Sequence, residues 1–150
     1  MPTFKYELEN VLNVREKLEG IKQKEYAQSL ATLESEKRIK QQIENSLKRS
    51  TLVFRDTISD AIDPRMIKMQ QNYHSLLKTQ EVLAVKNVAI AKKKTNKQRN
   101  ELLDAMKNKK TLEVLKEKKF EQFIQQEKKN EQQIVDEIVS FAYKHSKQWG

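Results

Sequence analysis

The side chains that most often carry out chemistry are few in this sequence, and they are scattered. The two histidines, His74 and His145, lie far apart, and cysteine is absent. A metal site needs clustered ligands and a nucleophile needs a base beside it, so this spacing predicts neither. Glycine occurs only at positions 20 and 150, which leaves no glycine-rich phosphate-binding loop. The sequence therefore predicts a protein that is not an enzyme and that has no cofactor and no metal.

Positive charge is the next feature that could have a chemical role. The formal net charge is +9, and residues 86–119 are markedly basic, with a run at Lys92–Lys94. A basic face suits nucleic acid, an anionic membrane or an acidic protein. No aromatic residue lies between Tyr73 and Phe120 to stack on bases, and too few apolar residues accompany the lysines for a membrane-surface helix. A solvated helix face is the simpler interpretation of the run, and nucleic-acid binding is the alternative.

Composition and periodicity predict long helices, and any basic surface must lie on these helices. Charged residues make up 34% and apolar residues 37%, which is too little for a thick core and typical of a coiled coil. Apolar residues recur every three or four positions, as at Phe4, Leu8 and Val11, and this spacing favours helices over disorder. Residues 93–101 include no apolar side chain, so the line of contact between the helices (the seam) should be weak or solvated there.

Pro64 divides the sequence into two helices. Proline breaks a preceding helix but suits the first turn of a new one, with Asp63 as its cap. The first helix is predicted to begin near Thr3 and to span about residues 3–58, followed by a turn at 59–64. The second helix is predicted over about residues 64–144, with a tail at 145–150. Short connections make consecutive helices antiparallel neighbours. We expect an all-α fold: one antiparallel two-helix coiled-coil hairpin over residues 1–150, its second helix longer than the first.

The unequal lengths predict a segment without a partner. Because every helical residue rises by about 1.5 Å, a chain that turns at residue 61 brings Phe4 close to Phe120. The residues after Phe120, here called the overhang, still carry apolar side chains at helical spacing and should form a binding surface. Weak self-association through residues 120–142 is one expected use. These apolar residues are Phe123, Ile124, Ile134, Ile138 and Phe141.

The sequence has neither a long apolar run nor an apolar leader. No stretch approaches the roughly 20 apolar residues that span a bilayer. Residues 1–14 include Glu7 and Glu9 and no separate apolar block, which is unlike a signal peptide. We therefore expect a soluble, cytoplasmic protein.

Segments at both ends of the sequence share a pattern with one known family. The start reads Phe4-x-Tyr6-x-Leu8-x-x-Val11-Leu12-x-x-Arg15-Glu16, followed by Tyr26-Ala27. The end reads Leu112-Glu113-x-Leu115-Lys116-x-Lys118-Lys119-Phe120, followed by Glu131 and Asp136-Glu137. The middle is similar too, with Arg65-x-Ile67, Gln70-Gln71 and Leu76. Over nearly the whole chain, these segments resemble the FliJ family of flagellar type III export proteins.

The resemblance implies a function. FliJ proteins are stalk-like adaptors of the bacterial flagellar export apparatus, cytoplasmic and peripheral to the basal body at the inner membrane. The implied partners are the hexameric export ATPase ring, the cytoplasmic domain of the export-gate membrane protein, and export chaperones that the adaptor escorts. Nucleic acid is not an expected partner, and the adaptor itself does not hydrolyse ATP.

The resemblance also implies two partner-binding surfaces. The first is an ATPase-binding end made of Leu8, Leu12, Arg15, Glu16, Lys116, Lys119, Phe120, Asp136 and Glu137. The second is an export-gate face made of Asn72, Leu76, Thr79 and Leu83, of which only Leu76 keeps the apolar character of the family. Two alternatives remain open. One is a structural coiled-coil scaffold that dimerises through the overhang, and the other is a basic helical protein that binds nucleic acid.

Overall fold

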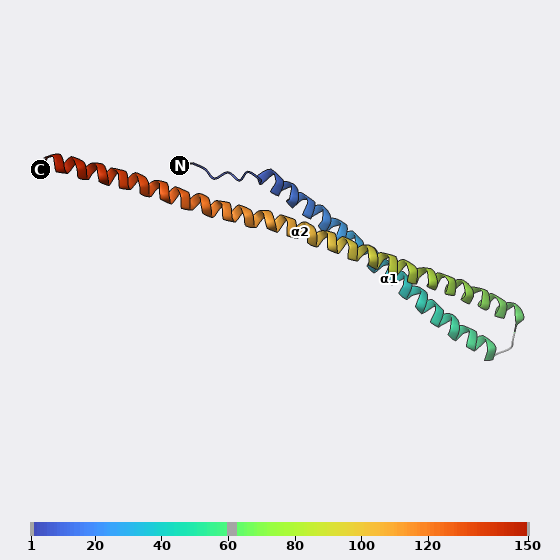
Figure 1. The fold of residues 1–150 in the computed structure, drawn as a ribbon. Helices are drawn as coiled ribbons and strands as arrows, with labels where there is room; N and C mark the ends of the chain where they lie inside the picture. Colours follow the sequence, from blue (N-terminus) through green and yellow to red (C-terminus); the bar gives the residue numbers. More distant parts are fainter. Residues whose placement is uncertain (1, 60–62, 150) are drawn as a thin grey trace. The chain divides into compact units, whose positions relative to one another are not determined.

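A computed structural model describes residues 2–59 and 63–149, most of which lie in two helices (Figure 1). Helix α1 spans Glu9–Ser59 and helix α2 spans Pro64–Trp149. The helices pack antiparallel and α2 is the longer, which confirms the predicted all-α fold class. Residues 60–62 of the predicted turn lie outside the described residues. Helix α2 continues to Trp149, beyond the end expected near residue 144.

Helix α2 begins as the sequence predicted. The Asp63 carboxylate accepts a hydrogen bond from the backbone N–H of Arg65 at 3.1 Å, and its carbonyl accepts one from the N–H of Ile67 at 3.2 Å. A capping side chain that satisfies a first-turn N–H stabilises a helix start by about 1 kcal/mol. Pro64, the first helical residue, needs no partner for a backbone N–H because it has none.

Helix α1 begins at Glu9, later than the start expected near Thr3. Phe4 and Tyr6 are half-buried, whereas Thr3, Lys5 and Glu7 are exposed. This alternation has the period of two that belongs to an extended segment, not to a helix. The N-terminal residues therefore extend along a neighbour and present two aromatic side chains to it.

The chain divides into two compact units, each of which includes parts of both helices. The hairpin unit comprises residues 20–104, and the terminal unit comprises residues 1–19 and 105–150. In the hairpin unit, Leu33 of α1 forms a buried cluster with Val88 and Ala91 of α2. Ala84, one helical step earlier, is only 3% exposed. Small residues at these positions let the two helix backbones approach closely.

One polar layer of the seam is buried, although the sequence predicted that the seam would be weak or solvated there. Thr95 is buried, and its hydroxyl donates to the carbonyl of Ala91 at 2.8 Å while lying 3.2 Å from the carbonyl of Ser29 on α1. The side chain of Ser29, also buried, donates to the carbonyl of Glu25 at 2.9 Å. Hydrogen bonds to backbone carbonyls satisfy these hydroxyls, so small polar side chains can replace apolar ones here.

Neither helix could cross a bilayer, since no part of the described chain is both long enough and apolar enough to do so.

Candidate functional site

An aromatic contact holds the N-terminal segment in the terminal unit. The Phe4 ring lies 5.3 Å from the Phe120 ring at an interplanar angle of 72°, and 5.5 Å from the Phe123 ring at 52°. Such edge-to-face and tilted arrangements are favourable for aromatic pairs. The contact between Phe4 and Phe120 confirms the meeting point that the helix lengths predicted. Phe123 belongs to the overhang, so the overhang is free of the N-terminal segment only after this turn.

Polar contacts extend this meeting of the N-terminal segment with α2, here called the junction, further along α2. The Tyr6 hydroxyl donates to the carbonyl of Leu112 at 3.2 Å, and Lys116 Nζ lies 2.9 Å from Glu9 Oε2. Sequence analysis assigned Lys116 to partner binding, but within the chain its ammonium is already paired. The family resemblance included Tyr6 and Leu112 in its motifs but did not predict the hydrogen bond between them, because that bond depends on the register between the two segments.

Lys109 continues this line of ion pairs in the terminal unit. Its Nζ lies 3.1 Å from Glu19 Oε2 on α1 and 3.8 Å from Glu113 Oε1 on α2. The hydrogen bond to Glu19 raises the pKa of Lys109 above its ordinary value. Sequence analysis missed this pair, since nothing in either local sequence distinguishes its members from other exposed charges. The ion pair favours one register of α1 against α2.

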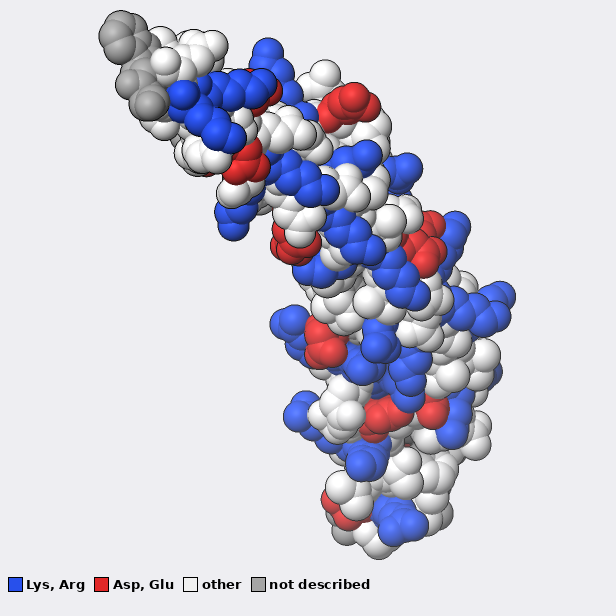
Figure 2. Space-filling view, turned by 60° about the vertical axis from the view of Figure 1, so that its left-hand side comes forward, with Lys and Arg blue, Asp and Glu red and all other residues white. Residues whose placement is uncertain are grey.

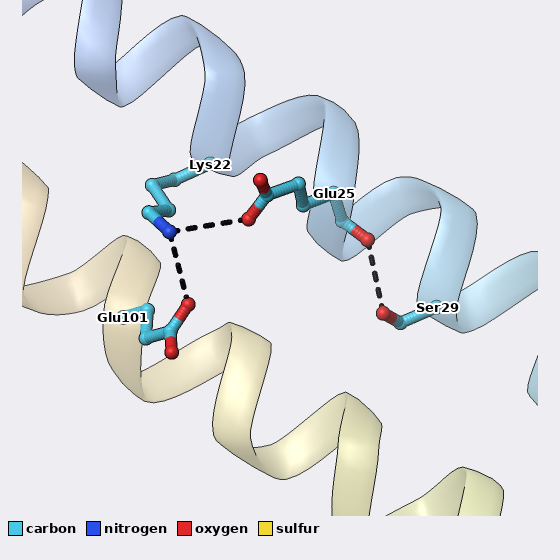
Figure 3. Close-up of polar contacts among 4 residues, drawn as sticks. All are labelled: Lys22, Glu25, Ser29 and Glu101. Carbon is cyan, nitrogen blue, oxygen red and sulfur yellow. Dashed lines mark hydrogen bonds and ion pairs between the residues drawn. The ribbon is translucent and has the colours of Figure 1, made fainter.

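Lys22 makes the corresponding contact in the hairpin unit (Figure 3). Its Nζ lies 3.1 Å from Glu101 Oε2 across the seam and 3.2 Å from Glu25 Oε2 on its own helix. These hydrogen bonds, first to Glu101 and then to Glu25, raise the pKa of the Lys22 ammonium. A lysine shared between two carboxylates favours one register of α1 against α2.

The predicted ATPase-binding residues have different environments in the structure. Leu12 is 8% exposed and packs within the terminal unit, and Arg15 is half-buried. Glu16 and Lys119 are exposed, and Phe120 is 47% exposed although it contacts Phe4. Leu8, just before α1, is 38% exposed. The junction thus brings the two ends of the motif together, with Leu12 in its interior and charged side chains at its surface.

The overhang carries the remaining predicted residues of this end. Asp136 and Glu137 are exposed, as are their apolar neighbours. Because successive helical residues turn by about 100°, the apolar side chains share one broad face and Asp136 and Glu137 lie outside it. The exposed apolar residues are Ile134 (56%), Val135 (54%), Ile138 (62%), Val139 (60%) and Phe141 (70%).

The predicted export-gate residues form one exposed strip on α2. Asn72, Leu76, Thr79 and Leu83 follow one another at intervals of three or four residues, and all are exposed. Leu76 is 54% exposed and Leu83 is 57% exposed, large values for leucines in a helical hairpin. The strip lies in the hairpin unit, on a different side of α2 from Ala84 and Val88, which pack against α1.

Sequence analysis missed a groove beside this strip. The groove lies in the hairpin unit between the last turns of α1 and the first turns of α2. Its lining offers amide and hydroxyl groups, one imidazole and one aromatic ring to a partner. The lining residues are Thr51, Phe54, Gln70, Gln71, Asn72, His74 and Ser75.

The basic run does not form a single patch. Lys92–Lys94 are all exposed, and successive side chains on a helix point in directions about 100° apart. Figure 2 shows Lys and Arg side chains interleaved with Asp and Glu side chains over the face in view. The three ammonium groups of the run therefore point to different sides of α2.

A family comparison decides the broad identity of the chain. The sequence model of the family described as "Flagellar FliJ protein" matches residues 4–148. The chain belongs to the FliJ family. Like the family, it is a non-catalytic component of flagellar or type III protein export. No curated protein shows significant sequence similarity to this FliJ-family chain.

A solved structure shares the fold of this FliJ-family chain. It is described as a YscO homolog from Chlamydia trachomatis, and it superposes with a TM-score of 0.69 at 19% sequence identity. The match covers 97% of this chain and 99% of the other. At this level of identity the likeness establishes a common fold, and partner residues do not follow from it.

Proposed function

We propose that the chain is a stalk-like adaptor of the export apparatus, which binds the hexameric export ATPase through its terminal unit and the cytoplasmic domain of the export gate through α2. It would work on the cytoplasmic side of the inner membrane and escort export chaperones. One observation carries the ATPase assignment: the junction of Phe4 with Phe120 is followed by an exposed, amphipathic overhang that includes Asp136 and Glu137. Charged and apolar side chains are together available there to a partner.

The junction suits a contact with a ring of subunits for two further reasons. Its interior contacts, from Phe4, Tyr6 and Leu12, hold the N-terminal segment and the start of α1 against α2. The surface charges therefore keep their positions. Glu16 and Lys119 remain exposed, and charges placed in this way set orientation and partner choice more than affinity. A contact of this kind could bias the conformations of the ATPase subunits without supplying any catalytic group.

Titration of the export ATPase tests this assignment. The protein should stimulate ATP hydrolysis, and Lys119→Glu should reduce the stimulation at a fixed subsaturating concentration by at least about threefold, because it replaces attraction by repulsion. Lys48→Glu is the matched control, since Lys48 is an exposed lysine of the hairpin unit. The release of phosphate is the measurement. Absence of stimulation by a fully helical protein would favour the scaffold alternative instead.

Binding to the isolated cytoplasmic domain of the export gate tests the second surface. Leu76→Ala should weaken this binding by about tenfold, as expected for an apolar anchor at the centre of an interface. Leu52→Ala is the control, because Leu52 is similarly exposed, at 59%, but lies on α1. Isothermal titration calorimetry gives both affinities. Equal affinities for Leu76→Ala and the unaltered protein would exclude this face from gate binding.

A further inference from the structure

A second strip of exposed apolar and basic residues follows α2 in the hairpin unit. Leu83, Ile90 and Lys97 lie seven residues apart, and Lys86 and Lys93 each follow by three residues. All five are exposed, with Leu83 at 57% and Ile90 at 56%, while Ala84, Val88 and Ala91 face α1. We call these five residues the outer face. Their heptad spacing is that of a coiled-coil seam, and the residues that the structure describes leave all five exposed.

Charge indicates what kind of partner the outer face would accept. Residues 82–100 contain six lysine and arginine residues and no aspartate or glutamate. The overhang has five acidic residues and four lysines, and two of the lysines, Lys144 and Lys147, lie beyond its apolar face, so residues 121–143 have five acidic residues against two lysines. It too is amphipathic and exposed. The chain therefore carries both a basic and an acidic helical surface of complementary charge.

The spacing of the two surfaces matches in one orientation. Read backwards, Phe141, Ile134 and Glu127 have the same seven-residue interval as Leu83, Ile90 and Lys97. Ile138 and Glu131 likewise match Lys86 and Lys93. A single antiparallel alignment thus produces two apolar pairs, two ion pairs and one contact of an isoleucine with a lysine stem. The pairs are Phe141–Leu83, Ile134–Ile90, Glu127–Lys97, Glu131–Lys93 and Ile138–Lys86.

Two other alignments are poorer. A parallel arrangement in the same register would set Glu127 against Leu83 and Phe141 against Lys97. Antiparallel pairing of two overhangs that matches Ile134 with Ile138 would set Glu131 against Phe141 twice. Each of these places a carboxylate opposite an apolar side chain, which costs desolvation without a partner. The outer face, aligned antiparallel, is therefore a better complement for the overhang than either of these two arrangements.

We infer that the overhang of one copy of this chain binds antiparallel to the outer face of a second copy. Both surfaces belong to helix α2, so while that helix is continuous they meet only between different copies. The contact is heterologous, because two different surfaces meet. Its matched layers cover only about two heptads, fewer than the three or four of a sustained coiled coil, so the association is weak and concentration-dependent. This inference does not depend on ATPase or gate binding.

Charge reversal on each surface, followed by mixing, tests the inference. Sedimentation equilibrium of the full chain at low ionic strength should show reversible self-association. The variant with both Lys93→Glu and Lys97→Glu should associate at least about fivefold more weakly, since attraction becomes repulsion at two layers. The variant with both Glu127→Lys and Glu131→Lys should show the same loss. A mixture of the two variants restores opposite charges and should associate again.

A matched control and two contrary results make the test decisive. Lys48→Glu with Lys92→Glu changes the net charge equally at exposed positions off the outer face, and should leave association within about twofold of the original. A chain that stays monomeric throughout the accessible concentration range would overturn the inference. So would a dimer that depends on Glu127 and Glu131 but not on Lys93 and Lys97, because that pattern belongs to paired overhangs.

Discussion

Val88→Asp should lower the free energy of unfolding of the hairpin unit by about 3 kcal/mol, because it places a carboxylate in an apolar contact without a partner. Val88 is 6% exposed and forms the buried cluster with Leu33 and Ala91. The carboxylate must either lose its hydration or separate the two helices. Each choice removes contacts from a seam that has few apolar layers, so the effect should be large for a single substitution.

Val82→Asp is the control for this substitution, since Val82 lies on the same helix and is 72% exposed. It introduces the same charge and the same change in helix propensity, without the burial. Denaturant unfolding followed by far-UV circular dichroism measures both free energies. Equal losses for the two variants would mean that the apolar cluster contributes little and that helix propensity dominates stability.

Phe4→Ala should release the N-terminal segment from the terminal unit. The Phe4 ring contacts both Phe120 and Phe123, and outside these contacts the segment relies on the hydrogen bond of Tyr6 to Leu112. Aromatic pairs contribute about 0.5–1.5 kcal/mol each beyond the area that they bury. Loss of both pairs should raise the population of the detached segment by about tenfold.

The rate of tryptic cleavage after Lys5, followed by mass spectrometry, reports this population when detachment is fast relative to cleavage. The control is Phe141→Ala, which removes a phenylalanine of the same unit that is 70% exposed. It should leave the cleavage rate unchanged. An unchanged rate in Phe4→Ala would show that the ring contacts do not hold the segment.

Much of the fold could be predicted because a helix has a constant rise and a recognisable period. Pro64 with Asp63 marked the start of α2, and the lengths of the two helices placed Phe4 opposite Phe120. The start of α1 was harder to predict. Phe4 fits a helical stripe with Leu8 and equally fits the two-residue alternation with Tyr6 that the structure has. Contacts with α2 decide between the two, and they are not visible locally.

The environments of the candidate site residues were less predictable. The family motif includes both Leu12 and Lys119, but the first is buried and the second is exposed. Lys116 is paired with Glu9, and Lys22 is shared by Glu25 and Glu101. Such pairs depend on the register between distant segments, whereas a sequence pattern reports only the periodicity of each segment. The burial of Thr95 was not predicted for the same reason, because one of the two carbonyls that its hydroxyl contacts, that of Ser29, lies on the other helix.

The shallow burial of the chain affects how it would lose structure. Among the described residues, no side chain is less than 2% exposed. A residue in a globular core touches about 6–12 others, but in a two-helix seam each layer has neighbours only before and after it. Disruption of one layer therefore weakens the adjacent layers first, as in a one-dimensional array with nearest-neighbour coupling. Within each unit, opening can then spread gradually along the seam, so stability depends on the number of layers and not on the depth of a core.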